Sequence, residues 1–387
     1  MINYGKHYID KSDIKNIVKT LNSEYLTQGP TVRLFEKKLN KFFGSKYCTV
    51  VNSGTAALHI AALALGWNKN SIIITTPLTF VATTNAVEYC NSKLELADIR
   101  DDGAIDPDSV EKIIKRLKLK KQKVTAVIGV DYYGNTCDWE KLKKLKKKYH
   151  FQIVNDNCHA LGTTYKSSEK YAIKYADIVT QSFHPVKNIT TGEGGCLITN
   201  NKKLKEKFDI LRTHGMVINK NSYASLNRKM NYLGFNYRLS DLNCALGISQ
   251  LKKVKFFIRR RRSIAKIYDR VFEKQKNYFS IPLKNKNCNP SYHLYPLRIK
   301  FDKLKINKKF FFKIIEKKFN IRLQVHYNPI FNQPYYKKKY KFKKKNYPET
   351  NKFFNEVVSL PIFYSLKKKE VLKIANVILK ICQKKKY

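Results

Sequence analysis

One lysine stands in a glycine-rich segment between two short apolar stretches. This segment, residues 181–195, contains Lys187 and has glycines at positions 192, 194 and 195. Glycine allows a tight turn and leaves room for a flat ligand. A lysine with its ordinary pKa of about 10.4 is protonated at neutral pH, so it attacks a carbonyl only where burial or neighbouring cations remove the proton. Because the chain has 77 lysines and arginines, a solvated lysine is the default interpretation unless other segments supply matching chemistry.

Two residues that follow expected strands complement such an amine. Asp156 follows the apolar stretch 151–154, with Asn155 between them. A carboxylate at a buried strand end needs a positively charged partner, and a protonated pyridine nitrogen is one. Phe80 follows the expected strand 72–75 and is placed to lie against a flat ring. Both residues therefore favour a flat, basic ring as the ligand.

An anion site is predicted where the expected strand 48–51 meets an alanine-rich helix. Ser53, Gly54 and Thr55 bring backbone N–H groups and hydroxyls to the helix N-terminus, which is a common phosphate-binding position. A lysine, a carboxylate for a ring nitrogen, a phosphate site and an aromatic side chain together predict pyridoxal 5′-phosphate (PLP) as the cofactor.

These segments resemble the DegT/DnrJ/EryC1/StrS family of nucleotide-sugar aminotransferases, which are PLP-dependent enzymes of fold type I. The similarity is strongest over residues 182–195 and extends from Tyr4 almost to the C-terminus. Within the family, residues 182–184, 4–5 and 324–330 are most similar to the branch that serves pseudaminic acid biosynthesis. The resemblance implies transfer of an amino group from L-glutamate to a UDP-linked 4-keto-6-deoxy-N-acetylhexosamine, giving a 4-amino-4,6-dideoxy sugar. Another 3- or 4-keto nucleotide sugar is the alternative substrate.

The same resemblance implies roles for individual residues around the cofactor. Lys187 holds the cofactor and moves the proton, while Asp156 keeps the ring nitrogen protonated. Ser182 joins Ser53, Gly54 and Thr55 at the phosphate. His159 contacts the side of the ring that carries the phenolic oxygen, although a hydrogen-bonded loop histidine is the alternative interpretation.

A homodimer with sites shared between its subunits is also implied by the resemblance. Asn236 is expected to reach the phosphate in the partner subunit, although on its own it is an ordinary turn residue. Thr27 and Gln28 are either substrate contacts or simple turn residues. The complete predicted set of substrate-binding residues is Tyr4, Thr27, Gln28, His326 and Tyr327.

The pattern of apolar stretches predicts an α/β fold with a mostly parallel seven-stranded sheet. The expected strands are residues 48–51, 72–75, 94–97, 124–130, 151–154, 178–183 and 196–199. Helical patterns separate several of them, which is typical of parallel strands joined by crossover helices. Ligands of such sheets bind beyond the strand ends, where Ser53, Phe80, Asp156 and Lys187 fall.

Three parts of the chain are expected. Residues 1–25 form an N-terminal arm and a first helix, residues 26–251 the large PLP-binding domain, and residues 252–387 a smaller α+β domain. In this last part a strand is expected at 321–327. The lysine- and tyrosine-rich stretch 335–347 is expected to be an exposed loop.

The formal net charge of +48 raises the possibility of a polyanion partner. No nucleic-acid-binding motif accompanies the lysines, and lysine, asparagine, isoleucine and tyrosine are all abundant, as an AT-rich genome would produce. We expect no specific nucleic-acid partner, and a noncatalytic polyanion-binding protein is the weaker alternative to an enzyme.

Eight cysteines are scattered without a CxxC pair, which favours free thiols in a reducing compartment. No metal site is predicted. The N-terminus does not resemble a signal peptide, and no apolar run reaches about 18 residues. We therefore expect a cytoplasmic protein without a membrane span.

Overall fold

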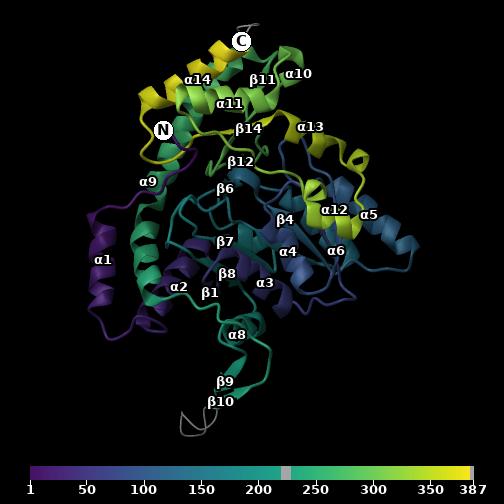
Figure 1. Ribbon diagram of the computed structural model, residues 1–387. Helices are drawn as coiled ribbons and strands as arrows, with labels where there is room; N and C mark the ends of the chain where they lie inside the picture. The colour runs from purple at the N-terminus through teal and green to yellow at the C-terminus, as the bar shows by residue number, and fades with distance from the viewer. Residues whose placement is uncertain (219–227, 384–387) are drawn as a thin grey trace.

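A seven-stranded sheet forms the centre of the computed structural model, which describes residues 1–218 and 228–383 (Figure 1). Its strands are β1 (Tyr47–Val51), β2 (Ile72–Thr75), β3 (Lys93–Leu96), β4 (Ala126–Val130), β5 (Gln152–Asp156), β7 (Ile178–Ser182) and β8 (Gly195–Thr199). They are arranged in the order β1-β8-β7-β5-β4-β2-β3. Strand β8 is antiparallel to β1 and β7, and the other neighbouring pairs are parallel. The predicted mostly parallel sheet is confirmed.

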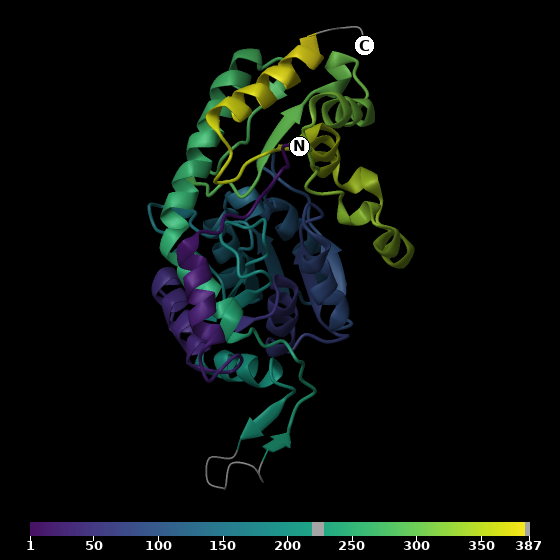
Figure 2. The same ribbon diagram turned by 60° about the vertical axis from the view of Figure 1, so that its left-hand side comes forward.

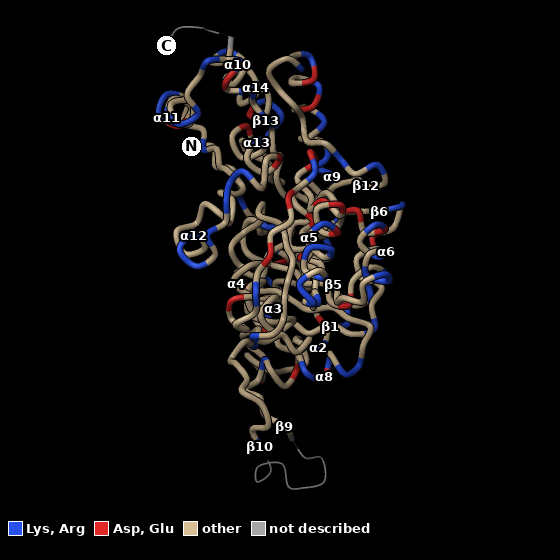
Figure 3. The backbone as a smooth tube through the Cα atoms, turned by 90° about the vertical axis from the view of Figure 1, so that its right-hand side faces the viewer, with Lys and Arg blue, Asp and Glu red and all other residues tan. Residues whose placement is uncertain are grey.

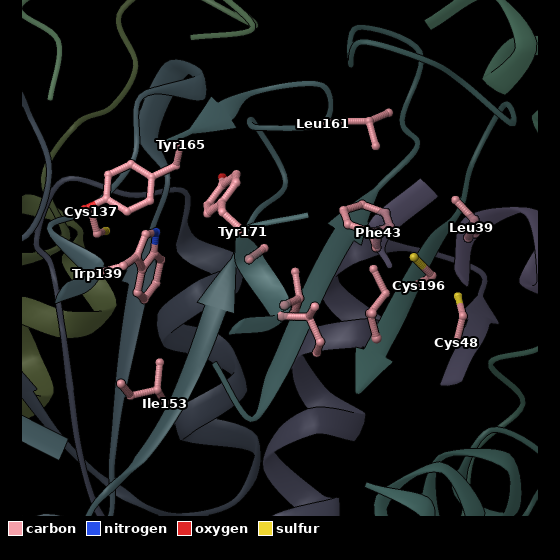
Figure 4. Packing of buried hydrophobic residues seen from close by; sticks show 14 of the residues in the cluster. Leu39, Phe43, Cys48, Cys137, Trp139, Ile153, Leu161, Tyr165, Tyr171 and Cys196 are labelled. Carbon is pink, nitrogen blue, oxygen red and sulfur yellow. The ribbon is translucent and has the colours of Figure 1, made fainter. Parts of the chain in front are cut away.

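Helices cover both faces of this sheet. Successive strand residues therefore point into different hydrophobic clusters, one on each face. Ile72 and Ile74 belong to one cluster, and Ile73 belongs to another, as expected for a strand buried on both faces. Figure 4 shows the first cluster, with Trp139 and Tyr171 packed beside the strands. The helices of this part are α1 (Lys11–Leu21), α2 (Pro30–Phe43), α3 (Gly54–Ala64), α4 (Val81–Tyr89), α5 (Pro107–Leu119), α6 (Trp139–Tyr149), α7 (Ala172–Tyr175) and α8 (Lys202–Leu211).

One long helix, α9 (Asp241–Phe272), connects the large sheet to the C-terminal part of the chain (Figure 2). Ser240 caps it, because its Oγ accepts the backbone N–H of Asn243 at 3.2 Å. The helix packs against α1 and α2 and also against α14 (Lys368–Gln383). The boundary predicted at residue 252 lies inside this continuous helix, and the division into domains stays a prediction.

The C-terminal part is built on a three-stranded antiparallel sheet of β11 (Phe279–Ser280), β13 (Tyr295–Ile299) and β14 (Val357–Leu360). Its core is a separate hydrophobic cluster that includes Phe311 and Ile374. Further helices are α10 (Phe301–Leu304), α11 (Lys308–Phe319), α12 (Pro334–Tyr340) and α13 (Pro348–Glu356). Two short strand pairs complete the fold, β6 (Thr164–Tyr165) with β12 (Cys288–Asn289), and β9 (Met216–Ile218) with β10 (Arg228–Met230).

Two local predictions were wrong. Residues 321–327 form only isolated bridges, one from Ile321 to Ile2 and one from Gln324 to Ser359, rather than a strand. The stretch expected as an exposed loop contains α12, where Tyr336 is buried and donates to Asn85 Oδ1 at 2.7 Å. The lysines of α12 are exposed, while Tyr336 packs on α4. The lysine-rich composition gave no sign of this buried side.

Basic residues occur in separate parts of the molecule. Figure 3 shows them along α6, α8, α11 and α12. Among the described residues, no helix combines the length and the apolar character needed to cross a membrane.

Candidate active site

A cavity of about 380 Å³ lies where the ends of β5 and β7 meet the N-termini of α3 and α4. Segments from the C-terminal part of the chain close its other side. Of the residues predicted from the sequence, the cavity is lined by Tyr4, Ser53, Gly54, Thr55, Phe80, Asp156, His159, Ser182, Lys187, His326 and Tyr327. The fold therefore gathers residues that are distant in the sequence into one chamber.

Lys187 lies in the loop between β7 and β8 and is partly buried. Its backbone N–H donates to the carbonyl of His184 at 2.9 Å. Within residues 1–218 and 228–383, no hydrogen-bond acceptor or carboxylate pairs with its Nζ. Burial lowers the pKa of this amine, against smaller opposing effects of Cys158 and Asp156. A lysine with these properties has a larger neutral, nucleophilic fraction than an exposed one.

Asp156 ends strand β5 and is almost fully buried. Its Oδ2 accepts the hydroxyl of Thr83 at 2.7 Å, and its Oδ1 accepts the backbone N–H of Cys158 at 3.3 Å. Thr83 in turn bonds Thr79 at 2.8 Å through their hydroxyls. These contacts hold the carboxylate in a fixed orientation at the cavity wall and leave it without a cationic partner among the described residues.

The N-terminus of α3 lies directly against Ser182. Ser53 is the N-cap of this helix, and its Oγ accepts the backbone N–H of Ala56 at 3.0 Å. A Cβ atom added to Gly54 would lie 2.8 Å from Ser182 Cβ, so only glycine fits there without movement. The helix N-terminus and two serine hydroxyls form the expected anion site.

His159, His326 and Tyr327 also line the cavity and are linked to one another or to neighbouring segments. His159 Nε2 lies 2.9 Å from the Tyr327 hydroxyl, and His326 Nδ1 lies 2.9 Å from Ser359 Oγ. Burial, with a smaller contribution from Lys187, lowers the pKa of His159 far below its usual value and that of His326 to about 3. Both imidazoles are therefore neutral at physiological pH.

The rings of Phe80 and Tyr4 contact these residues. Phe80 is 55% exposed and its ring centroid is 5.8 Å from that of Tyr327, so one face stays free. The ring of Tyr4 lies 5.4 Å from that of His326, and the Tyr4 carbonyl accepts the N–H of Ile362 at 3.1 Å.

Three predicted residues lie outside the cavity of their own chain. Thr27 is exposed and forms a bridge with Ser240. Gln28 lines a different cavity together with Arg33 and Arg238. Asn236 is exposed, and its backbone carbonyl accepts Asn52 Nδ2 at 3.4 Å.

The cavity also contains residues that sequence reasoning missed, among them Thr83, Cys158, His293 and Glu193. Thr83 is close to Phe80 in the sequence, but Phe80 precedes α4 and no pattern marked Thr83 as a partner of Asp156. No sequence signal marked His293, whose ring centroid lies 4.4 Å from that of His159, with the two rings tilted by 49°.

Residues 7–379 match the DegT/DnrJ/EryC1/StrS aminotransferase family. The chain belongs to this family. It is 38% identical over 387 residues to the UDP-4-amino-4,6-dideoxy-N-acetyl-beta-L-altrosamine transaminase of Campylobacter jejuni, and the match covers 100% of this chain and 99% of that protein.

Solved structures of the family share the whole architecture. Helicobacter pylori PseC, an aminotransferase involved in the biosynthesis of pseudoaminic acid, superposes with a TM-score of 0.88 and is 34% identical, covering 97% of this chain and 98% of its own. The PMP form of a sugar aminotransferase, Spr1654 from Streptococcus pneumoniae, superposes with a TM-score of 0.89 at 25% identity, covering 99% of both chains. The predicted fold class and aminotransferase activity are confirmed.

Proposed function

We propose that this aminotransferase uses PLP to move an amino group from L-glutamate to a UDP-linked 4-keto-6-deoxy-N-acetylhexosamine, giving the 4-amino-4,6-dideoxy sugar used for pseudaminic acid. One observation carries the cofactor assignment. The partly buried amine of Lys187, with its lowered pKa, shares a cavity with the carboxylate of Asp156 and the N-terminus of α3.

The residues present fit PLP at each of its functional groups. The buried Asp156 carboxylate has two hydrogen-bond donors and no cation of its own, so a protonated ring nitrogen would complete it. At the N-terminus of α3 the Ser53 Oγ accepts the N–H of Ala56, and the N–H groups of Gly54 and Thr55, which have no acceptor among the described residues, suit a phosphate. The free face of Phe80 suits an aromatic ring.

When bound, PLP supplies a carbon that accepts the amino group and a ring that delocalises the electron pair left at the donor's Cα. The protein supplies the proton transfers. Lys187 Nζ, whose pKa is lowered by burial, takes the Cα proton as a general base and returns it as a general acid. Asp156, held by Thr83, keeps the ring nitrogen protonated.

The choice of sugar rests on relatives. The transaminases of C. jejuni and H. pylori, at 38% and 35% identity, are both named for UDP-4-amino-4,6-dideoxy-N-acetyl-beta-L-altrosamine. We assign Tyr4, His326 and Tyr327 to the sugar because they line the same cavity as Lys187 and Phe80.

A homodimer is supported by exposed apolar side chains. Ile14, Val18 and Leu21 lie on one face of α1 and are about half exposed, at 54%, 48% and 52%. Met230, the last residue of β10, and Leu233 shortly after it are 64% and 80% exposed. Strands β9 and β10 extend away from the rest of the chain (Figures 1 and 2). Apolar surface of this kind is typical of a protein interface.

A shared site follows from the same arrangement. Asn236 is exposed and absent from the cavity of its own chain, so a role at the phosphate requires the partner subunit. Thr27 and Gln28 also lie outside that cavity, and we assign them to the partner's substrate for the same reason. We propose a cytoplasmic location, which eight free cysteines support.

The test of the reaction is a substrate panel. Purified protein with PLP and L-glutamate is given UDP- and dTDP-linked keto sugars, and products are identified by NMR. We expect amination at C4 of the UDP-linked sugar, with no turnover by Lys187→Ala. Turnover by Lys187→Ala at the wild-type rate would refute the mechanism, and preference for another keto sugar would refute the substrate.

Mixed dimers test the shared site. Co-expressed Lys187→Ala and Asn236→Ala chains should regain activity, because a mixed dimer has one site with both wild-type residues. Co-expressed Lys187→Ala and Asp156→Asn chains are the control, since both changes affect the cavity of their own chain and no site is restored. Equal activity of the two mixtures would contradict a role for Asn236 in the partner's site.

A further inference from the structure

A chain of hydrogen bonds leads from a backbone amide through His159 to the hydroxyl of Tyr327. The Tyr133 N–H donates to His159 Nδ1 at 3.3 Å, and His159 Nε2 lies 2.9 Å from the Tyr327 hydroxyl. His159 and Tyr327 both line the cavity that contains Lys187. This series of hydrogen bonds therefore ends at the proposed reaction site.

The first bond determines the tautomer of His159. A backbone N–H can only donate, so Nδ1 must accept and carries no proton. Burial keeps the pKa of the ring far below its usual value, so the ring is neutral and its single proton is on Nε2. The other tautomer would direct two hydrogens at each other between Tyr133 N and Nδ1. Contact with the tilted ring of His293, at a centroid distance of 4.4 Å, also limits rotation of the ring.

The tautomer then determines the direction of the second bond. His159 Nε2–H donates to the Tyr327 oxygen, and the tyrosine's own hydrogen is left without an acceptor among residues 1–218 and 228–383. Burial raises the pKa of Tyr327 well above its usual value, so the hydroxyl stays protonated. Tyr327 therefore presents an O–H to the cavity.

We propose that Tyr327 donates a hydrogen bond to a ligand oxygen that gains negative charge during transamination, and that His159 is the residue that positions it for this role. This inference rests on the proposed function, because the oxygen belongs either to the phenolic group of PLP or to the carbonyl of the keto sugar. A fixed donor aimed at such an oxygen stabilises the charge without reorganisation. If Tyr327 only contacted the substrate, as donor or as acceptor, His159 would not be needed. If Tyr327 must always donate, His159 is needed because its Nε2–H occupies the tyrosine oxygen and leaves the hydroxyl hydrogen for the ligand.

The tautomer is measurable without any reaction. In protein labelled with ¹⁵N-histidine and loaded with PLP, long-range ¹H–¹⁵N NMR spectra distinguish protonated Nε2 from protonated Nδ1. The signals of His159 are identified by their loss in His159→Gln, and the measurement is repeated without PLP. We expect a proton on Nε2 in both samples, and a proton on Nδ1 in the loaded protein would overturn the proposal.

Half-reactions of Tyr327→Phe identify the oxygen. If Tyr327 serves PLP, both half-reactions should slow by roughly 10²-fold, the usual loss for one such donor, and the pH dependence of the visible absorbance of the loaded protein should shift. If it serves the sugar carbonyl, the half-reaction with L-glutamate and the absorbance stay unchanged, while the half-reaction with the keto sugar slows. Unchanged rates in both half-reactions would overturn the proposal.

The matched control is Tyr133→Phe. Tyr133 is also a buried tyrosine, its hydroxyl donates to the Leu283 carbonyl, and its backbone N–H survives the substitution. We expect wild-type half-reactions from this variant. If the wild-type protein formed no coloured complex with PLP, the proposed function would be refuted. The tautomer of His159, measured without PLP, would still show whether His159 donates to Tyr327.

Discussion

Replacing Thr83 with valine removes the strongest bond that orients Asp156. The Thr83 hydroxyl donates to Asp156 Oδ2 at 2.7 Å, and the remaining donor, the Cys158 N–H, lies at the longer distance of 3.3 Å. Thr83 is fully buried, so valine of nearly the same shape leaves no space for water to replace the hydroxyl. Asp156 would then face the ring nitrogen of PLP with only one long hydrogen bond to hold it.

The expected magnitude follows from the charge of the acceptor. A hydrogen bond to a charged group contributes about 1.5–3 kcal/mol, and about 1.4 kcal/mol corresponds to a factor of ten in a dissociation constant. If all of this free energy supports cofactor binding, the dissociation constant for PLP rises by about 10- to 150-fold. That range is an upper limit, because part of the bond also stabilises the cofactor-free protein.

The assay is a titration of the visible absorbance of the purified variant with PLP. Thr84→Val is the matched control, because Thr84 is also fully buried on α4 but donates to the carbonyl of Val81 at 3.1 Å. We expect Thr83→Val to bind PLP at least several-fold more weakly than Thr84→Val. Equal dissociation constants in the two variants would refute the idea that Thr83 holds Asp156 for the cofactor.

Two further predictions concern the phosphate site and the histidines. Gly54→Ala would bring a Cβ within 2.8 Å of Ser182 Cβ; the resulting strain of about 1–3 kcal/mol should weaken PLP binding roughly tenfold in the same titration, and unchanged affinity would contradict the close packing. Because burial lowers the pKa of His326 to about 3, the folded state stays neutral there while the unfolded state binds a proton below about pH 6.5, so stability falls on acidification by up to about 1.4 kcal/mol per pH unit. His326→Gln should make this loss shallower between pH 6.5 and pH 4 in urea unfolding, and an unchanged slope would be the contrary result.

Much of the large sheet was readable from the sequence because its strands are buried on both faces. Ile72, Ile73 and Ile74 form a continuous apolar run, and both neighbouring clusters take side chains from it. In the C-terminal part this signal is weaker. Residues 321–327 pair with neighbours only at isolated positions. In α12 Tyr336 is buried, and the many lysines around it obscure the apolar pattern in the sequence.

The sequence by itself determined which groups could act on a cofactor, because residue type and strand ends are local properties. Lys187, Asp156 and the Ser53 segment were found in this way. Only the tertiary structure decided that Thr83 orients Asp156, that the ring of His293 contacts that of His159, and that Asn236 stays outside the cavity of its own chain. These relations join segments that are far apart in the chain and meet only in the folded structure. A local sequence pattern carries no information about which distant residues come into contact.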